Sequence, residues 1–216
     1  MALTLVIGNK NYSSWSMRPW LALAHHKIPF EEILIPLYEP GSREKILAHS
    51  PAGKVPVLID GEARVWESLA ILEHLAERFP QAALWPKDAA ARAHARAIST
   101  EMHAGFAALR QHCPMNLKRQ KSRPLTPEVE NDVARVGELW RDARARFGKG
   151  GEYLFGAFSA ADCMYAPVAT RFKSYEIKTD PVMAAYVEAI HALPAFRQWR
   201  EAGLKESWVL PHNEFD

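Results

Sequence analysis

The pattern of apolar residues changes between residues 80 and 88, and this change limits the fold more than any other feature of the chain. Before it, short apolar runs alternate with turn residues, as buried strands and their connections do. After it, the sequence is rich in Ala, Arg and Leu and contains no convincing strand. We therefore predict a mixed α/β domain over residues 1–80, a linker over 81–88 and an all-helical domain over 89–216.

The first part is predicted to contain four strands. Each lies in a short, mostly apolar run bounded by turn residues. The four runs are 3–8, 30–37, 54–60 and 62–68. Asp60-Gly61 lies between the last two runs and predicts a tight hairpin turn.

Three helices are expected to alternate with these strands in the order βαβαββα. Pro19 suits the first turn of the first helix, because proline has no N–H group to donate, and Ser42 opens the second helix. The third helix ends at Pro80 and carries Leu69, Leu72, Leu75 and Phe79 on one face. The three ranges are 15–27, 42–50 and 68–79.

The second part is predicted to begin with one long helix from Ala89 to about His112. Residues 112–128 contain a local basic cluster without interleaved aromatic residues, so we expect a solvated surface loop there. The remaining helices are predicted from their opening residues, which are typical of N-termini. They run from Thr126-Pro127 to about Gly148, from Ser159, from about Pro181 and from about Pro194.

Composition narrows the class of partner. The 27 Lys and Arg residues nearly balance the 25 Asp and Glu residues, so the chain lacks the net charge that attracts nucleic acids or anionic lipids. The first residues lack a basic leader, and no apolar run approaches the ~20 residues that cross a bilayer. We expect a cytoplasmic protein whose partner is a small molecule or another protein. Cys113 and Cys163 are expected to be small buried residues, and no histidine pair has metal-binding spacing, so no metal is expected.

Residues 9–20, NKNYSSWSMRPW, place three serines, an arginine and two tryptophans between the first strand and the first helix. Hydroxyl groups at such a junction can cap the helix, hold an anion or activate a nucleophile. The residues alone leave these three roles open.

Four motifs, spread over essentially the whole chain, resemble those of the glutathione transferase superfamily. The serine-rich motif is most similar to the zeta class, although Trp15 stands where the zeta pattern has a cysteine. The resemblance implies a thioredoxin-like domain followed by a helical bundle, glutathione as co-substrate, and a homodimer. The four motifs are SSWSMR after the first strand, SPAGKVPVL at the third, ESLAILEHL at the last helix of the first domain and SAADCMYAPV in the second domain.

The resemblance implies that a serine hydroxyl activates the thiol of glutathione. A free thiol has a pKa of about 8.5, and a hydroxyl donor together with the start of a helix stabilises the thiolate. The zeta register favours Ser13, with Ser14 as the alternative and Tyr12 as the third choice. Ser16 is expected to cap the helix, and Arg18 to form an ion pair or to assist an anionic substrate.

The same resemblance implies how glutathione is held. If the Val55-Pro56 bond is cis, Val55 presents its backbone to the cysteinyl part of the peptide like a neighbouring strand, next to Lys54. Glu67 is expected to pair with the γ-glutamyl ammonium group. Ser68 and the start of its helix are expected to hold the γ-glutamyl carboxylate, although Ser68 could equally be a simple helix cap.

The second domain is expected to supply the pocket for the electrophile, together with Trp15. Met102, His103, Phe106 and Arg110 lie at helical neighbour spacing, and a plain amphipathic core helix would explain Met102 and Phe106 equally well. Asp162 has the spacing of a capping box with Ser159, so we assign it to structure.

The function expected from these residues is glutathione-dependent transfer to, or isomerisation of, small hydrophobic electrophiles. The motif lacks cysteine, which disfavours thiol exchange. Trp15 in place of the zeta cysteine argues against maleylacetoacetate isomerase activity, although that isomerisation needs mainly the thiolate of bound glutathione. The alternative is a glutathione-binding carrier or interaction module without turnover.

Overall fold

The computed structural model describes residues 2–214, and its first part has the predicted βαβαββα order. The two parallel strands and the hairpin form one sheet, in the order β2-β1-β3-β4, with β1 and β2 parallel and the other pairs antiparallel. Asp60 pairs with Ala63, which confirms the predicted tight hairpin. The elements are β1 (Leu3–Ile7), α1 (Ser14–His25), β2 (Phe30–Leu34), α2 (Ser42–Leu47), β3 (Val57–Asp60), β4 (Ala63–Trp66) and α3 (Ser68–Arg78).

Alternate residues of β1 face opposite sides of the sheet, as the strand period of two requires. Leu5 and Ile7 belong to the main core, which continues into α1 and α3, whereas Val6 packs in a smaller cluster with Ile46 of α2. On α3, the predicted apolar face is confirmed at Leu72 and Leu75, which are fully buried.

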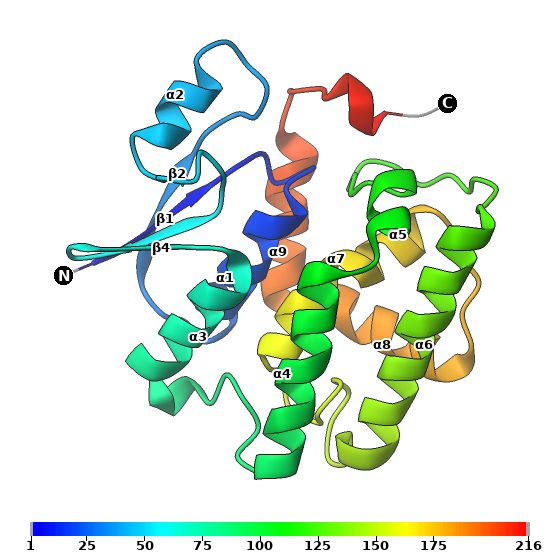
Figure 1. Ribbon diagram of the computed structural model, residues 1–216. Coiled ribbons are helices and arrows are strands. Elements are labelled where there is room, and N and C mark those ends of the chain that lie inside the picture. The colour runs from blue at the N-terminus through cyan, green and yellow to red at the C-terminus, as the bar shows by residue number, and fades with distance from the viewer. Residues whose placement is uncertain (1, 215–216) are drawn as a thin grey trace.

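The second part is helical, and α1 joins the two parts because it packs against α3, α7 and α9 (Figure 1). The predicted starts after Thr126 and Ser159 are confirmed, since both residues cap their helices. The elements are η1 (Pro80–Ala82), α4 (Ala89–Ala104), α5 (Ala107–His112), α6 (Pro127–Phe147), α7 (Ala160–Ser174), α8 (Pro181–Ala192), α9 (Pro194–Lys205) and η2 (Pro211–Asn213).

The prediction of one helix from Ala89 to His112 is wrong. The chain breaks between α4 and α5, where Gly105 is extended and Phe106 has a left-handed backbone with φ of 56°. A side chain at Gly105 would lie 2.7 Å from the carbonyl oxygen of Glu101. The break therefore needs a glycine, but a left-handed phenylalanine after it gives no signal in the sequence.

The position predicted for Pro19 is also wrong. The helix α1 begins at Ser14, so Pro19 is its sixth residue rather than part of its first turn. Proline cannot donate to the carbonyl four residues earlier, which leaves the carbonyl of Trp15 without its helical partner.

The expected solvated loop at 112–128 is buried in its first half. Cys113, Met115, Asn116 and Leu117 are each 5% exposed or less, because α7 lies against them. Arg171 of α7 donates from Nε to the carbonyl of Cys113 at 2.8 Å.

Two expectations concern residues without a role in chemistry. Cys113 and Cys163 are buried, as predicted, and neither forms a disulfide. Asp162 accepts hydrogen bonds from the N–H and the hydroxyl of Ser159 and from the N–H of Leu154, which confirms the capping box.

Within residues 2–214, no helix is long and apolar enough to cross a membrane, and no three His, Cys, Asp or Glu side chains are grouped to hold a metal ion.

Candidate active site

Two adjoining cavities lie where β1 ends and α1 begins. The larger, of about 630 Å³, is lined by residues 12–15, by α2 and the loop before it, by residues 53–55 and by the C-terminal residues 210–213. The smaller, of about 240 Å³, lies against residues 66–68, His103 and Arg110. Trp15, Lys54 and Val55 line both cavities.

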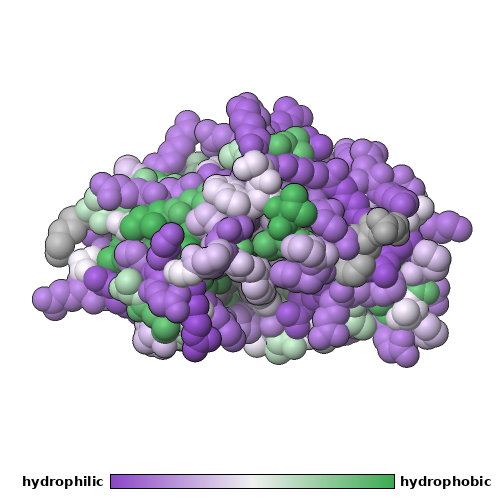
Figure 2. All heavy atoms as spheres, turned by 90° about the horizontal axis from the view of Figure 1, so that it is seen from above, coloured by the Kyte–Doolittle hydropathy of each residue, from purple (hydrophilic) through white to green (hydrophobic). Residues whose placement is uncertain are grey.

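The helix α2 and the C-terminal segment, which both line the larger cavity, lie on the same side of the molecule (Figure 1). Seen from that side, apolar side chains gather in a band that is bordered by hydrophilic residues (Figure 2). A site of this size, part apolar and part polar, suits a small molecule.

Ser13 and Ser14 line the larger cavity, and their hydroxyl groups have different surroundings. Ser13 is the N-cap of α1: its Oγ accepts from the N–H of Ser16 and lies 2.7 Å from the Ser16 Oγ. Ser14 is the first residue of the helix, and its Oγ has no hydrogen-bond partner among residues 2–214. The Ser14 hydroxyl is thus available to a ligand at a positive helix end.

The expectation that Ser16 caps α1 is wrong. The helix begins earlier than predicted, so Ser13 takes the cap and Ser16 lies within the first turn. The Ser16 Oγ instead accepts from the N–H of Gly8 at 3.1 Å and is fully buried.

The third candidate donor, Tyr12, is occupied elsewhere. Its hydroxyl donates to Oε1 of Glu214 at 2.6 Å. Burial, followed by this contact with Glu214, raises the pKa of Tyr12. These contacts make the serine hydroxyls better candidates than the Tyr12 hydroxyl for donating a hydrogen bond to a thiolate.

Arg18 links the first turn of α1 to α7. It is fully buried, donates to the carbonyls of Ser14 at 2.9 Å and Met164 at 3.1 Å, and stacks 4.0 Å from the ring of Trp15. The ion pair considered for Arg18 is absent, since no carboxylate of residues 2–214 pairs with it. Burial, and then the nearby Arg171 and Arg110, lower its pKa.

The Val55-Pro56 bond is cis, as the resemblance implied. Neither the N–H nor the C=O of Val55 has a protein hydrogen-bond partner in the described chain. Val55 lines both cavities and Lys54 is exposed beside it. An extended peptide can therefore pair with this backbone.

Glu67 and Ser68 line the smaller cavity at the start of α3. Glu67 has φ of 68°, and its Oε2 lies 3.5 Å from Nε2 of His103. The alternative that Ser68 is a simple helix cap is wrong, because its hydroxyl donates to the carbonyl of Trp15 at 2.8 Å and makes no cap bond. The N–H groups of the first turn of α3 remain available to an anion.

Of the residues expected to meet the electrophile, Trp15, His103 and Arg110 reach the smaller cavity. His103 packs edge-on against Trp15 at 5.3 Å, and Arg110 lies 5.5 Å from the same ring. The assignment of Met102 and Phe106 is wrong. Both are buried core residues that line neither cavity, as the alternative of a core helix anticipated.

Three lining features were not found from the sequence. Arg43 of α2 is exposed at the larger cavity and makes no ion pair with a described residue. Tyr38 packs edge-on against His212 at 4.5 Å, so the C-terminal segment closes one side of the cavity. Loops and tails carry no periodic pattern, which explains why sequence reasoning missed Tyr38 and the C-terminal segment. Arg43 lies on the short helix α2, where no motif singled it out.

Family models match both parts of the chain. A model of the glutathione S-transferase N-terminal domain matches residues 12–78, and a model of the C-terminal domain matches residues 89–202. A probable maleylacetoacetate isomerase of Caenorhabditis elegans is 29% identical over 190 residues, covering 85% of this chain and 87% of the relative. A zeta-class glutathione S-transferase of Euphorbia esula is 25% identical over 192 residues, covering 86% and 84%.

Solved structures share the fold. A maleyl pyruvate isomerase, described as a bacterial zeta-class glutathione S-transferase, has a TM-score of 0.73 at 23% identity and covers 95% of this chain and 100% of its own. A glutathione transferase homologue from Burkholderia with bound glutathione has a TM-score of 0.72 at 21% identity, covering 94% and 98%.

Proposed function

The chain belongs to the glutathione S-transferase family, and from this premise we propose that it activates the thiol of bound glutathione for attack on small electrophiles. The single observation that carries the proposal is the Ser14 hydroxyl, which has no partner in residues 2–214 and lines a cavity at the start of α1 beside the unpaired backbone of Val55. Relatives named as transferases and isomerases support it.

Glutathione lies across both cavities in this proposal. Its γ-glutamyl ammonium group pairs with Glu67, and its γ-glutamyl carboxylate meets the N–H groups at the start of α3. Its cysteinyl backbone pairs with Val55. Its glycyl carboxylate meets Lys54 and Arg43, which are exposed at the larger cavity. The division into domains at 1–80 and 89–216, with a linker at 81–88, belongs to the same proposal.

Ser14 supplies the hydrogen bond that stabilises the thiolate. Lowering the pKa of a thiol from about 8.5 by ~2 units needs ~2.7 kcal/mol of preference for the thiolate. A charge-assisted hydroxyl donor and the dipole of α1 can supply this amount. Ser13, which the sequence favoured, shares its hydroxyl with Ser16, so its role is to fix the start of the helix.

The thiolate then attacks an electrophile held in the larger cavity. Attack on an activated alkene forms a carbon–sulfur bond and breaks the C=C π bond, whose electron pair moves onto the conjugated carbonyl as an enolate. A proton from water then completes the conjugate, or rotation about the new single bond and expulsion of the thiolate re-form the alkene with the opposite geometry. Trp15 is the wall shared by both cavities, and residues 210–213 close the side of the larger one. Conjugation and cis–trans isomerisation use the same thiolate, so a panel of electrophiles that includes maleylacetone decides between them.

We further propose a homodimer in a reducing, cytoplasmic compartment. Small side chains on the outer surfaces of α3 and α4 allow a second copy to approach closely; the exposed alanines are Ala70, Ala89, Ala90, Ala93, Ala97 and Ala104. Sedimentation of a dimer that Ala97→Arg dissociates would support this assembly. A wild-type monomer would overturn it.

Two measurements test the activation of glutathione. Calorimetry should detect binding of glutathione to the wild-type protein, and also binding of S-methylglutathione, whose thiol is blocked. Ultraviolet absorbance of the thiolate should then give a thiol pKa about two units below that of free glutathione. No uptake would overturn the proposal, and uptake with an unshifted thiol pKa would leave only the binding module.

A further inference from the structure

We propose that Glu206 is a positioning residue, whose carboxylate fixes the turn that carries Ser13 and Ser14. The proposal rests on the function proposed above. It concerns a residue of the C-terminal segment that lines neither cavity and lies almost two hundred positions from the serines.

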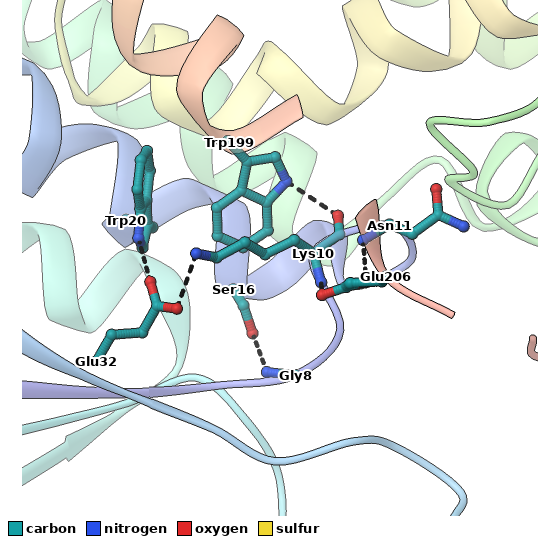
Figure 3. A network of polar contacts seen from close by, with 8 residues as sticks. All are labelled: Gly8, Lys10, Asn11, Ser16, Trp20, Glu32, Trp199 and Glu206. Carbon is teal, nitrogen blue, oxygen red and sulfur yellow. Dashed lines mark hydrogen bonds and ion pairs between the residues drawn. The ribbon is translucent and has the colours of Figure 1, made fainter. Parts of the chain in front are cut away.

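The carboxylate of Glu206 accepts two hydrogen bonds from successive backbone N–H groups (Figure 3). Its Oε1 accepts from Lys10 at 2.7 Å and its Oε2 from Asn11 at 2.9 Å. A carboxylate that bridges adjacent N–H groups fixes the orientation of both peptide planes, and such charge-assisted bonds are stronger than neutral ones.

The same turn continues directly into the serines. The carbonyl of Asn9 accepts from the N–H groups of Tyr12 at 3.2 Å and Ser13 at 2.8 Å. Lys10 and Asn11 are therefore the two residues enclosed by this turn. Any rotation of their peptide planes shifts the first residues of α1, including the Ser14 hydroxyl.

Other contacts bring the helical part to the same two residues. Trp199 of α9 donates from Nε1 to the carbonyl of Lys10 at 3.0 Å. The Asn11 side chain accepts from the N–H groups of Leu117 and Lys118 at 2.9 and 3.2 Å. Lys118 also donates from Nζ to the carbonyl of Glu206.

Lys10 is held from the sheet side as well. Its Nζ forms an ion pair with Glu32 at 2.8 Å and lies 5.3 Å from the ring centroid of Trp20 and 5.6 Å from that of Trp199 (Figure 3). These contacts hold the side chain of Lys10 but leave the backbone N–H groups of Lys10 and Asn11 to Glu206. A substitution of Glu206 would therefore leave both N–H groups without the carboxylate that accepts from them.

The test compares Glu206→Ala and Glu206→Gln with Glu201→Ala as the matched control. Glu201 is an exposed α9 carboxylate whose ion pair is with Lys205. Glu206→Ala removes both oxygen atoms that accept from the turn. Glu206→Gln keeps one accepting oxygen and places an NH₂ group, which cannot accept, opposite the other backbone N–H.

We expect Glu206→Ala to lower kcat by about tenfold to hundredfold, the size of effect that a misplaced catalytic group produces. The thiol pKa of bound glutathione should rise toward its free value, while the affinity for S-methylglutathione changes less than twofold. Glu206→Gln should be intermediate and Glu201→Ala unchanged. Amide hydrogen exchange at Lys10 and Asn11 should quicken in Glu206→Ala even without glutathione.

An unchanged thiol pKa in a folded Glu206→Ala protein would overturn the positioning role, and so would equal losses of kcat and S-methylglutathione affinity. Failure of the wild-type protein to take up S-methylglutathione would instead overturn the proposed function. The exchange measurement would then still report whether Glu206 holds the turn.

Discussion

The hydroxyl of Ser68 donates a 2.8 Å hydrogen bond to the carbonyl oxygen of Trp15, the acceptor that Pro19 cannot satisfy. This bond joins the start of α3 to the first turn of α1. It therefore ties the expected γ-glutamyl end of the site to the expected thiol end.

Ser68→Ala should destabilise the protein by about 1–2 kcal/mol, because the Trp15 carbonyl loses its donor. In a Pro19→Ala background the new N–H of residue 19 can donate to that carbonyl, so the same substitution should cost less. A double-mutant cycle in denaturant measures the difference. An equal cost in both backgrounds would show that the Trp15 carbonyl is not the reason.

Ser14→Ala should raise the pKa of the bound thiol and lower kcat by roughly a hundredfold, as expected when a charge-stabilising donor is lost. Ser13→Ala should mainly lower stability, by about 1 kcal/mol, because it removes the N-cap of α1. Thiolate absorbance and unfolding curves separate the two effects. A loss of kcat in Ser13→Ala but not in Ser14→Ala would show that Ser13, not Ser14, donates to the thiolate.

Glu67→Gln should weaken glutathione binding about tenfold to hundredfold, because it removes a charge-assisted contact to the γ-glutamyl ammonium group. The dipeptide cysteinylglycine lacks this group, so its affinity should hardly change. Calorimetry with both peptides makes the comparison. Equal weakening of both would mean that Glu67 shapes the site without recognising the γ-glutamyl arm.

Burial raises the pKa of Asp162 from its ordinary value of 3.8 to about 6, against the hydrogen bonds that favour its charged form. Between these pH values the folded state keeps a proton that the unfolded state has lost. The contribution to stability is therefore present below pH 3.8 and is lost as pH rises through about 6, an effect on the order of 3 kcal/mol. The unfolding free energies of the wild type and of Asp162→Asn are measured between pH 4 and 7, and their difference isolates the contribution of Asp162. A difference that does not change with pH would contradict the prediction.

Much of the fold could be predicted because local patterns agree with it. Short apolar runs became strands, Asp60-Gly61 became the hairpin, and Ser159 with Asp162 formed the capping box. The cis bond at Val55-Pro56 followed from the family resemblance rather than from the residues alone. These features depend on neighbours in the chain, which the sequence displays directly.

The errors share a different cause. Met102 and Phe106 have the right spacing for a pocket but belong to the main core, because Met102 lies on the buried face of α4 and Phe106 lies at the break between α4 and α5. Ser16 and Ser68 carry hydroxyls suited to capping, but Gly8 and Trp15 occupy them. Each outcome depends on a partner that is brought near only when distant segments pack.

The sequence by itself determined the two-part architecture, the order of its elements and the motifs of a glutathione site, because periodicity, turn residues and caps act over a few positions. Only the tertiary structure decided which hydroxyl is available to a ligand and which carboxylate holds the loop beneath it. Ser14 keeps an unpartnered hydroxyl among the described residues because Ser13 and Ser16 bond each other, and Glu206 reaches Lys10 and Asn11 because α9 packs against α1. Such competition for hydrogen-bond partners is settled in space, where residues far apart in the chain meet.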